Sequence, residues 1–473
     1  MSLRRLLDSP TAMTSASLGM RLGGAFIILG AVLGTLPEAS VSLWLLLRTI
    51  VGLRIIGDLG FGNTLVRAIA YAMGGATDLE RPAPKSTPQK PQATNWQMLG
   101  EICGTMEIIY RRIALIAGGF LLLVVTPLMV RPIGLLDDPT VGWWSWAAVL
   151  STLPVVFRGN AYQTFLVGTD HVALVRRWEA ATSLGNLLSA ITVLYLGGGL
   201  LMLVVVTQAW EVINVARNYW LGHAILEGRL RSLRRHPYSP EVFASVWPRA
   251  WRSGAGVLLT TGANQSSGLI YAQIGDAGAV ASYLIALRLY DAANQFSTAP
   301  FYSRLPLMAR LHAEGRRADL VGLARARMAG SLWLLTAVLL AVGVSGPALL
   351  RLLGSEVTFV PTSLWAILAL AAFGERYGSM HLQLYTTTNH VLWHKINAVY
   401  AAIFLTVSFA LVGRIGVFAF PVAMLSGYAG FYAWYNARLS HRAFRLGFLS
   451  FEGRAMAPQL MLLAVGLAII LGW

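Results

Sequence analysis

"RIIGDLGFGNTLVRAIA", residues 54–70, is apolar enough to cross a membrane, yet it carries three charged residues, Arg54, Asp58 and Arg67. A charged side chain at the centre of a bilayer costs roughly 2.5 to 3.5 kcal/mol on insertion scales. The stretch also has glycines at positions 57, 60 and 62, and each glycine inside a helix costs about 1 kcal/mol relative to alanine. Such a segment faces protein or water rather than lipid. Its glycines serve either close helix packing or a bending point.

The rest of the chain has the composition of a membrane protein. It is 56% hydrophobic and only 12% charged, whereas a soluble domain averages about 25% charge. Apolar segments of about 20 residues, each long enough for the hydrocarbon core, recur along it. We predict an all-α polytopic fold with a shorter thirteenth segment near 457–472 and twelve spans, near 20–36, 43–68, 113–131, 143–167, 180–197, 200–221, 253–274, 279–303, 329–350, 361–383, 395–413 and 415–436.

The basic residues fix the predicted orientation. With a cytoplasmic N-terminus, and with residues in the end turn of a span counted with the adjoining segment, 29 of the 37 Lys and Arg residues fall in cytoplasmic segments and 3 in outside segments. This bias is the positive-inside rule. The net charge of +16 is therefore spread over loops rather than gathered on one face, which argues against nucleic acid as a partner.

Motifs for catalysis are missing from the sequence. The predicted outside loops are as short as "GDAG" (275–278), and the chain has no D-x-D, no H-E-x-x-H zinc spacing and no phosphate-binding loop. We therefore predict no catalytic residues, no metal ligands and no cofactor, and a protein that is not an enzyme.

A basic stretch divides the chain. We predict an N-terminal lobe of six spans (1–222), a basic cytoplasmic inter-lobe loop (223–252), a C-terminal lobe of six spans (253–437) and a cytoplasmic loop with the thirteenth segment (438–473). An offset of 240 residues aligns "SLWLLLR" (42–48) with "SYLIALR" (282–288). Two such repeats, related by a pseudo-two-fold axis around a polar central cavity, are a common plan of secondary transporters.

Polar residues inside the predicted spans are the candidate site. The arginines are Arg48, Arg54, Arg158, Arg288 and Arg376, the acids are Asp58, Asp291 and Glu375, and the amides are Asn264, Gln265 and Asn294. Arg54 and Asp58 are four residues apart, so on one helix they would share a face and pair. Such an ion pair either holds two helices together or forms part of a ligand-binding site. Five arginines against three acids leave two surplus positive charges, which suits an anionic ligand with phosphate oxygens.

The segment "GDLGFGNTLVRAIA" (57–70), the 6+6 layout and the basic central loop resemble the polysaccharide and O-antigen flippases of the multidrug/oligosaccharidyl-lipid/polysaccharide exporter superfamily over about 20–436. The resemblance implies alternating access and transfer of an undecaprenyl-diphosphate-linked oligosaccharide from the inner to the outer leaflet of the bacterial cytoplasmic membrane. The product would be exopolysaccharide, capsule or the O-antigen of lipopolysaccharide. A thirteenth span departs from the family, which usually has 12 or 14.

This resemblance suggests a role for each candidate residue. The arginines and amides are assigned to substrate binding, and Asp58, Asp291 and Glu375 to coupling with H⁺ or Na⁺. The expected partners are the lipid-linked glycan, membrane lipids and polysaccharide polymerase or export proteins. Two alternatives stay open. A multidrug exporter of the same superfamily would favour unpaired carboxylates for its cations, and a membrane enzyme of glycan assembly would need a catalytic base and an extramembrane pocket.

Overall fold

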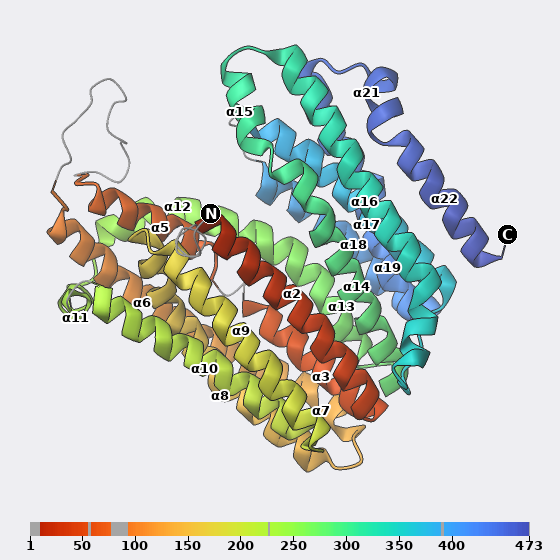
Figure 1. Cartoon of the computed structure of the whole chain (residues 1–473), viewed down its shortest axis with the longest axis horizontal. Coiled ribbons are helices and arrows are strands. Elements are labelled where there is room, and N and C mark those ends of the chain that lie inside the picture. The colour runs from red at the N-terminus through yellow and green to blue at the C-terminus, as the bar shows by residue number, and fades with distance from the viewer. Residues whose placement is uncertain (1–9, 55–57, 77–92, 226–227, 389–391, 473) are drawn as a thin grey trace. The chain divides into compact units, whose positions relative to one another are not determined.

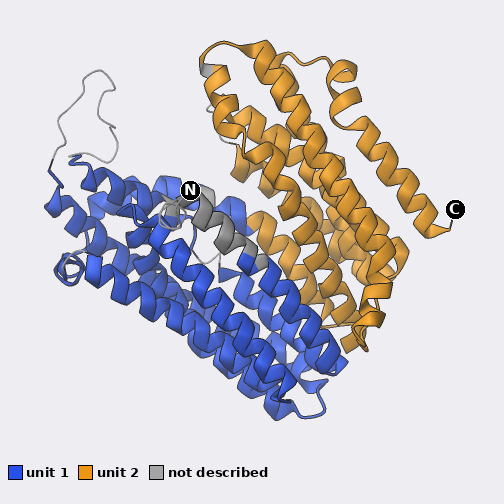
Figure 2. Cartoon of the chain, in the orientation of Figure 1, with its two compact units in different colours: residues 1–258 blue, residues 259–473 orange. Residues whose placement is uncertain are grey.

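The computed structural model describes residues 10–54, 58–76, 93–225, 228–388 and 392–472, and all regular structure in these ranges is helical. Figure 1 shows the helices in chain order. The chain forms two compact units, Met1–Leu258 and Leu259–Trp473, coloured separately in Figure 2. The all-α fold predicted from the sequence is confirmed. Six spans in each half stay a prediction.

Unit 1 is a bundle of helices. Its helix α2 packs along α9, and α8 packs along α10 and α6. The helices of this unit are α2 (Pro10–Thr35), α3 (Glu38–Gly52), α5 (Phe61–Met73), α6 (Trp96–Phe120), α7 (Thr126–Gly134), α8 (Pro139–Gly168), α9 (Val172–Tyr195), α10 (Gly199–Ile225), α11 (Arg229–Leu233) and α12 (Pro240–Val257).

In unit 2, too, all regular structure among the described residues is helical. Its helix α14 packs against α16 and α17, and α22 packs against α16. The helices of this unit are α13 (Ala263–Tyr271), α14 (Ala277–Tyr302), α15 (Leu305–Ala313), α16 (Arg317–Leu352), α17 (Thr362–Thr386), α18 (Trp393–Ile415), α19 (Ala419–Gly427), α20 (Ala433–Phe444), α21 (Phe448–Ala455) and α22 (Ala457–Leu471).

The predicted continuous span 43–68 is wrong. Helix α3 ends at Gly52 and α5 begins at Phe61, and between them Leu59 and Gly60 have φ angles of +48° and +73°. A left-handed residue cannot continue a right-handed helix, and glycine adopts this conformation at little cost. Of the two roles considered for the glycines, Gly60 therefore takes part in a turn that divides the segment. Gly57 lies outside the described residues.

The predicted inter-lobe loop contains helices α11 and α12. Helix α12 carries an aromatic face, on which Phe243 and Trp247 stack with Phe61 of α5 at ring-centroid distances of 6.4 and 5.8 Å. Gly254 of α12 lies against the break itself, because a Cβ atom there would be 2.5 Å from the Leu59 carbonyl group. The segment that links the two units thus packs on the turn between α3 and α5.

The apolar helices mark a membrane protein. Five helices of the described chain are long and apolar enough to cross a bilayer, or six if α21 and α22, bent by 48° from each other, form one span. Large apolar side chains on α6, such as Leu115 and Ile116, are more than 70% exposed in the isolated chain. Lipid is the solvent that such a surface needs.

Three helical segments in the described part of the chain contain a π-helical turn. These turns are Leu121–Val125 between α6 and α7, Leu258–Gly262 between α12 and α13, and Tyr428–Tyr432 between α19 and α20. A π turn is wider than an α-helical turn and is often found at functional sites.

Candidate functional site

Unit 1 encloses a polar cavity of about 520 Å³, within the ~300–1,000 Å³ range of ligand pockets. Its walls come from α2, α3, α5, α8, α9 and α10. Three of the sequence-predicted residues line it, Arg48, Arg54 and Asp58. The other charged residues of the lining are Arg21, Arg176, Glu179, Glu211 and Arg217.

Arg54 is paired with an acid of another helix rather than with its predicted partner. Its Nη1 atom donates to Oε2 of Glu211 on α10 at 2.6 Å. The predicted pair with Asp58 is wrong, because the chain turns between the two residues and they do not lie on one helical face. Asp58 instead accepts from the backbone N–H of Gly62 at 2.9 Å and from the Tyr110 hydroxyl at 2.7 Å. The Asp58 carboxylate therefore holds the first turn of α5 against α6.

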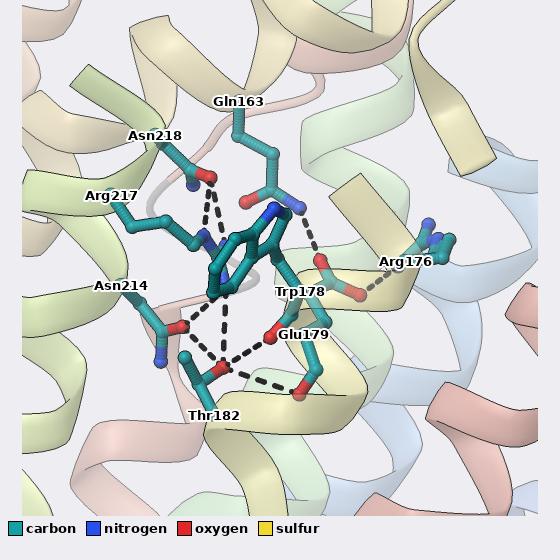
Figure 3. Close-up of polar contacts among 8 residues, drawn as sticks. All are labelled: Gln163, Arg176, Trp178, Glu179, Thr182, Asn214, Arg217 and Asn218. Atoms are coloured by element: carbon teal, nitrogen blue, oxygen red, sulfur yellow. Dashed lines mark hydrogen bonds and ion pairs between the residues drawn. The ribbon is translucent and has the colours of Figure 1, made fainter. Parts of the chain in front are cut away.

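Arg217 is the centre of the hydrogen-bond cluster in Figure 3. Its Nη1 atom donates to Asn214 Oδ1 at 2.9 Å and to Thr182 Oγ1 at 3.1 Å, and its Nη2 atom donates to Asn218 Oδ1 at 2.8 Å. Each of these acceptors is a neutral oxygen. The cluster fixes the guanidinium in place through neutral acceptors, while Glu179 lies close enough to interact with its charge. It leaves the NH₂ groups of both asparagines as further donors.

Glu179 is the acidic residue of this cluster. Glu179 accepts from Arg176 Nη1 at 2.7 Å and from Gln163 Nε2 at 3.0 Å, so α8 and α9 meet at its carboxylate (Figure 3). Thr182, one turn further along α9, donates to Asn214 Oδ1 at 2.8 Å. These contacts connect three helices around one wall of the cavity.

The cavity has a positive electrostatic balance. Its lining contains five arginines and three acids, a formal surplus of two positive charges. Two of the acids, Glu211 and Glu179, are already in ion pairs with Arg54 and Arg176. A guanidinium presents a planar fork of N–H donors that matches phosphate oxygens. The arrangement can hold an anionic group with several oxygen acceptors.

Arg158 has different neighbours from the other predicted arginines of unit 1. Its guanidinium is bonded to Glu107 at 2.9 Å, and the second oxygen of Glu107 is bonded to Arg234 at 2.5 Å. Its side chain is 54% exposed, and it is not part of the cavity lining described above. We therefore leave Arg158 out of the candidate site.

The remaining predicted residues lie in unit 2 and contact one another. Glu375 accepts from Tyr290 and from Asn294, and Arg376 donates to the Asn294 backbone carbonyl at 2.5 Å. Gln265 donates to Asp291 at 3.2 Å. Asn264 is bonded to the hydroxyls of Tyr400 and Tyr428, and Arg288 lies close enough to Asp291 to interact electrostatically. Substrate contact by these residues stays a prediction.

The sequence analysis missed several lining residues that carried a readable signal. Glu211 and Arg217 both lie inside the predicted span 200–221, where charged side chains mark an internal polar site. Glu179 and Arg176 stand just before the span predicted at 180–197. Nothing in their spacing shows which helix they face, because that depends on how the bundle packs.

Comparison with solved structures identifies the fold. An inward-facing MATE family multidrug transporter of the MOP superfamily superposes with a TM-score of 0.66 at 13% identity, covering 91% of this chain and 98% of that one. The lipid II flippase MurJ, in an inward closed conformation, gives 0.63 at 10% identity over 97% and 98%. The MATE multidrug transporter DinF-BH gives 0.58 at 14% over 94% and 98%. No family model and no curated protein matches the sequence.

Proposed function

We propose that this protein is a secondary transporter that flips an undecaprenyl-diphosphate-linked oligosaccharide from the inner to the outer leaflet of the bacterial cytoplasmic membrane by alternating access. The fold supports transport, since the similar structures are transporters and a lipid flippase. The observation that carries the proposal is the arginine surplus of the unit 1 cavity. The glycan would serve exopolysaccharide, capsule or O-antigen assembly, together with polymerase or export proteins.

The diphosphate is the part of this substrate that the cavity suits best. It carries negative charge and several oxygen acceptors in a small volume, and Arg217 presents a guanidinium whose hydrogen bonds go to neutral oxygens. Arg48 and Arg54, which precede the turn between α3 and α5, line the same cavity. Bidentate arginine contacts to phosphate are stronger than neutral hydrogen bonds by roughly a factor of two.

Coupling to H⁺ or Na⁺ is assigned to unit 2. Asp291 and Glu375 both lie among polar side chains there. Asp58, the third acid predicted for this role, already accepts two hydrogen bonds that secure α5. We therefore give Asp58 a structural role and place the coupling ion at Asp291 or Glu375.

The test compares two arginines of unit 1. In cells, Arg217→Ala should remove surface polysaccharide and cause lipid-linked glycan to accumulate on the inner leaflet, while the variant is still found in the membrane. Arg158→Ala is the matched control, because it removes an arginine that lies outside the cavity lining, and it should transport normally. Equal loss in both variants, or normal transport by Arg217→Ala, would refute the proposed site.

A multidrug exporter is the second candidate, favoured by the similarity to MATE multidrug transporters. A cationic drug needs a carboxylate to pair with, and the cavity acids Glu179 and Glu211 are held by arginines. Efflux of a cationic dye from cells that express the chain separates the two functions. Dye efflux that survives Arg217→Ala, without any change in surface glycan, would favour the drug exporter.

A further inference from the structure

Two histidines and a glutamate from three helices meet inside unit 2. His381 lies near the end of α17, His441 near the end of α20, and Glu452 in α21. One ligand atom from each lies within 4.8 Å of the other two. His381 is fully buried and Glu452 is 2% exposed. Buried charged groups are paired or coordinate metals, because an isolated charge is too costly away from water.

The tautomer of His381 follows from its neighbour. The Ser440 hydroxyl has a single proton, and the Ala437 carbonyl at 3.0 Å is an acceptor for it. With the proton on that contact, His381 Nδ1, 2.6 Å from the same hydroxyl oxygen, donates to Ser440, and this is the tautomer that a metal at Nε2 requires. In a neutral imidazole the proton is then on Nδ1, and Nε2 presents a lone pair.

This lone pair faces a second electron donor. His381 Nε2 is 3.3 Å from Glu452 Oε1, but the contact lacks the geometry of a hydrogen bond. His441 Nε2 approaches the same carboxylate oxygen at 2.7 Å. A positive charge between these atoms would bind all three donors at once.

We propose that His381, His441 and Glu452 bind a zinc ion. Imidazole nitrogen and carboxylate oxygen are both zinc ligands, and two such atoms around a tetrahedral ion at 2.0–2.1 Å lie about 3.3 Å apart. The distance between His381 Nε2 and Glu452 Oε1 has this value. The 2.7 Å between His441 Nε2 and the same oxygen is a hydrogen bond, so zinc would displace its proton and widen that distance. Water or the second oxygen of Glu452 supplies the fourth position.

The surroundings fit a metal site. The bond from His381 Nδ1 to Ser440 orients the ring, as outer-shell partners of zinc-bound histidines do. The His441 side chain is 14% exposed, which gives the ion an entry path. Since Glu452 belongs to α21, the ion would fasten α21, and with it the α22 that follows, to α17 and α20.

The test uses the purified full-length protein in detergent or nanodiscs. After chelation, addition of zinc and dialysis, the wild type should retain close to one zinc ion per chain, and Co²⁺ in its place should give the visible absorption of a tetrahedral site. His441→Ala and Glu452→Gln should lose retained metal. Ser440→Ala, which alters only the outer shell, should weaken zinc affinity by about 10-fold to 100-fold. His223→Ala, in unit 1, is the control and should bind like the wild type.

Each outcome decides the matter. Zinc retention in the wild type that falls in the ligand and Ser440 variants, with the control unchanged, establishes the site. Wild-type protein that retains far less than one zinc ion per chain, or that binds zinc no more tightly than Ser440→Ala, overturns it and leaves a proton as the cation between these residues. Because the wild-type and Ser440→Ala measurements are sufficient by themselves, a ligand variant that fails to fold does not affect the result.

Discussion

Arg54 and Glu211 lie 157 residues apart in the chain and form an ion pair of 2.6 Å in the wall of the unit 1 cavity. Their side chains are 36% and 24% exposed, so solvent weakens their attraction and the pair should contribute less than about 1 kcal/mol to stability. Its larger effect is on the charge of the cavity, because Glu211 offsets one of the five arginines.

Replacing this acid should strengthen anion binding. Glu211→Gln raises the formal surplus of the cavity from two positive charges to three, so the purified variant should bind pyrophosphate more tightly than the wild type. This gain in affinity should shrink as salt is added, because added ions weaken the attraction between exposed charges. The attraction falls off over a Debye length of about 10 Å at 0.1 M. Titration at low and high salt checks this. A gain in affinity that is insensitive to salt would contradict an electrostatic cause.

The geometry of Arg217 predicts a graded response. Arg217→Lys keeps the charge but cannot reach Asn214 and Asn218 at once with a planar fork. We expect pyrophosphate affinity to fall by about 10-fold, since a hydrogen bond to a charged group contributes roughly 1.5–3 kcal/mol. Arg217→Ala should lose more. Calorimetric titration of the three proteins measures the order, and a lysine variant equal to the wild type would show that charge alone matters.

Asp58 should matter for stability. Its carboxylate accepts from the Gly62 N–H and the Tyr110 hydroxyl, and removing a side-chain acceptor from the N–H groups of a first helical turn costs about 0.5–2 kcal/mol. Asp58→Ala should therefore lower the midpoint of thermal unfolding in detergent, and Asp58→Asn, which keeps an acceptor oxygen, should lower it less. Asp137→Ala, in an exposed connection, is the control. Normal stability of Asp58→Ala would contradict the structural role of Asp58 and favour its role in coupling to H⁺ or Na⁺.

The break between α3 and α5 can be tested through its neighbour. In Gly254→Ala the new Cβ would lie 2.5 Å from the Leu59 carbonyl group, too close for either backbone to stay in place. We expect lower thermal stability and reduced transport. Gly119→Ala adds the same methyl group at a position with no atom within 4 Å and should be neutral or slightly stabilising. Equal behaviour of the two variants would mean that α12 does not support the break.

Orientation can be checked with single cysteines. Ser86→Cys, in a predicted cytoplasmic segment, should react with an impermeant reagent only after the inner face is exposed, and Asp137→Cys, in a predicted outside loop, should react in intact cells. The native Cys103 is buried and should give little background. Reaction of Ser86→Cys in intact cells would reverse the predicted topology.

The helical class was predicted correctly from the sequence. Arg48 and Arg54 were predicted to face a polar cavity between two lobes, and they line a cavity within unit 1, as charged residues in apolar helices turn inward. The partner of Arg54 was not predicted, since contacts between helices far apart in the chain depend on how each helix is rotated in the bundle. The grouping of His381 with His441 and Glu452 was not predicted, for the same reason. They follow no short spacing along the chain and meet only because α17, α20 and α21 pack together.

The three π turns have a consequence for tracing the ancestry of this chain. A π turn takes one residue more than the α-helical turn it replaces, and one residue corresponds to about 100° of rotation around a helix. A sequence alignment with a relative that lacks the turn at Leu121–Val125, Leu258–Gly262 or Tyr428–Tyr432 therefore needs a one-residue gap inside a helix. Without that gap, every later position in the helix is matched to a residue on a different face, and lipid-facing positions are scored against buried ones.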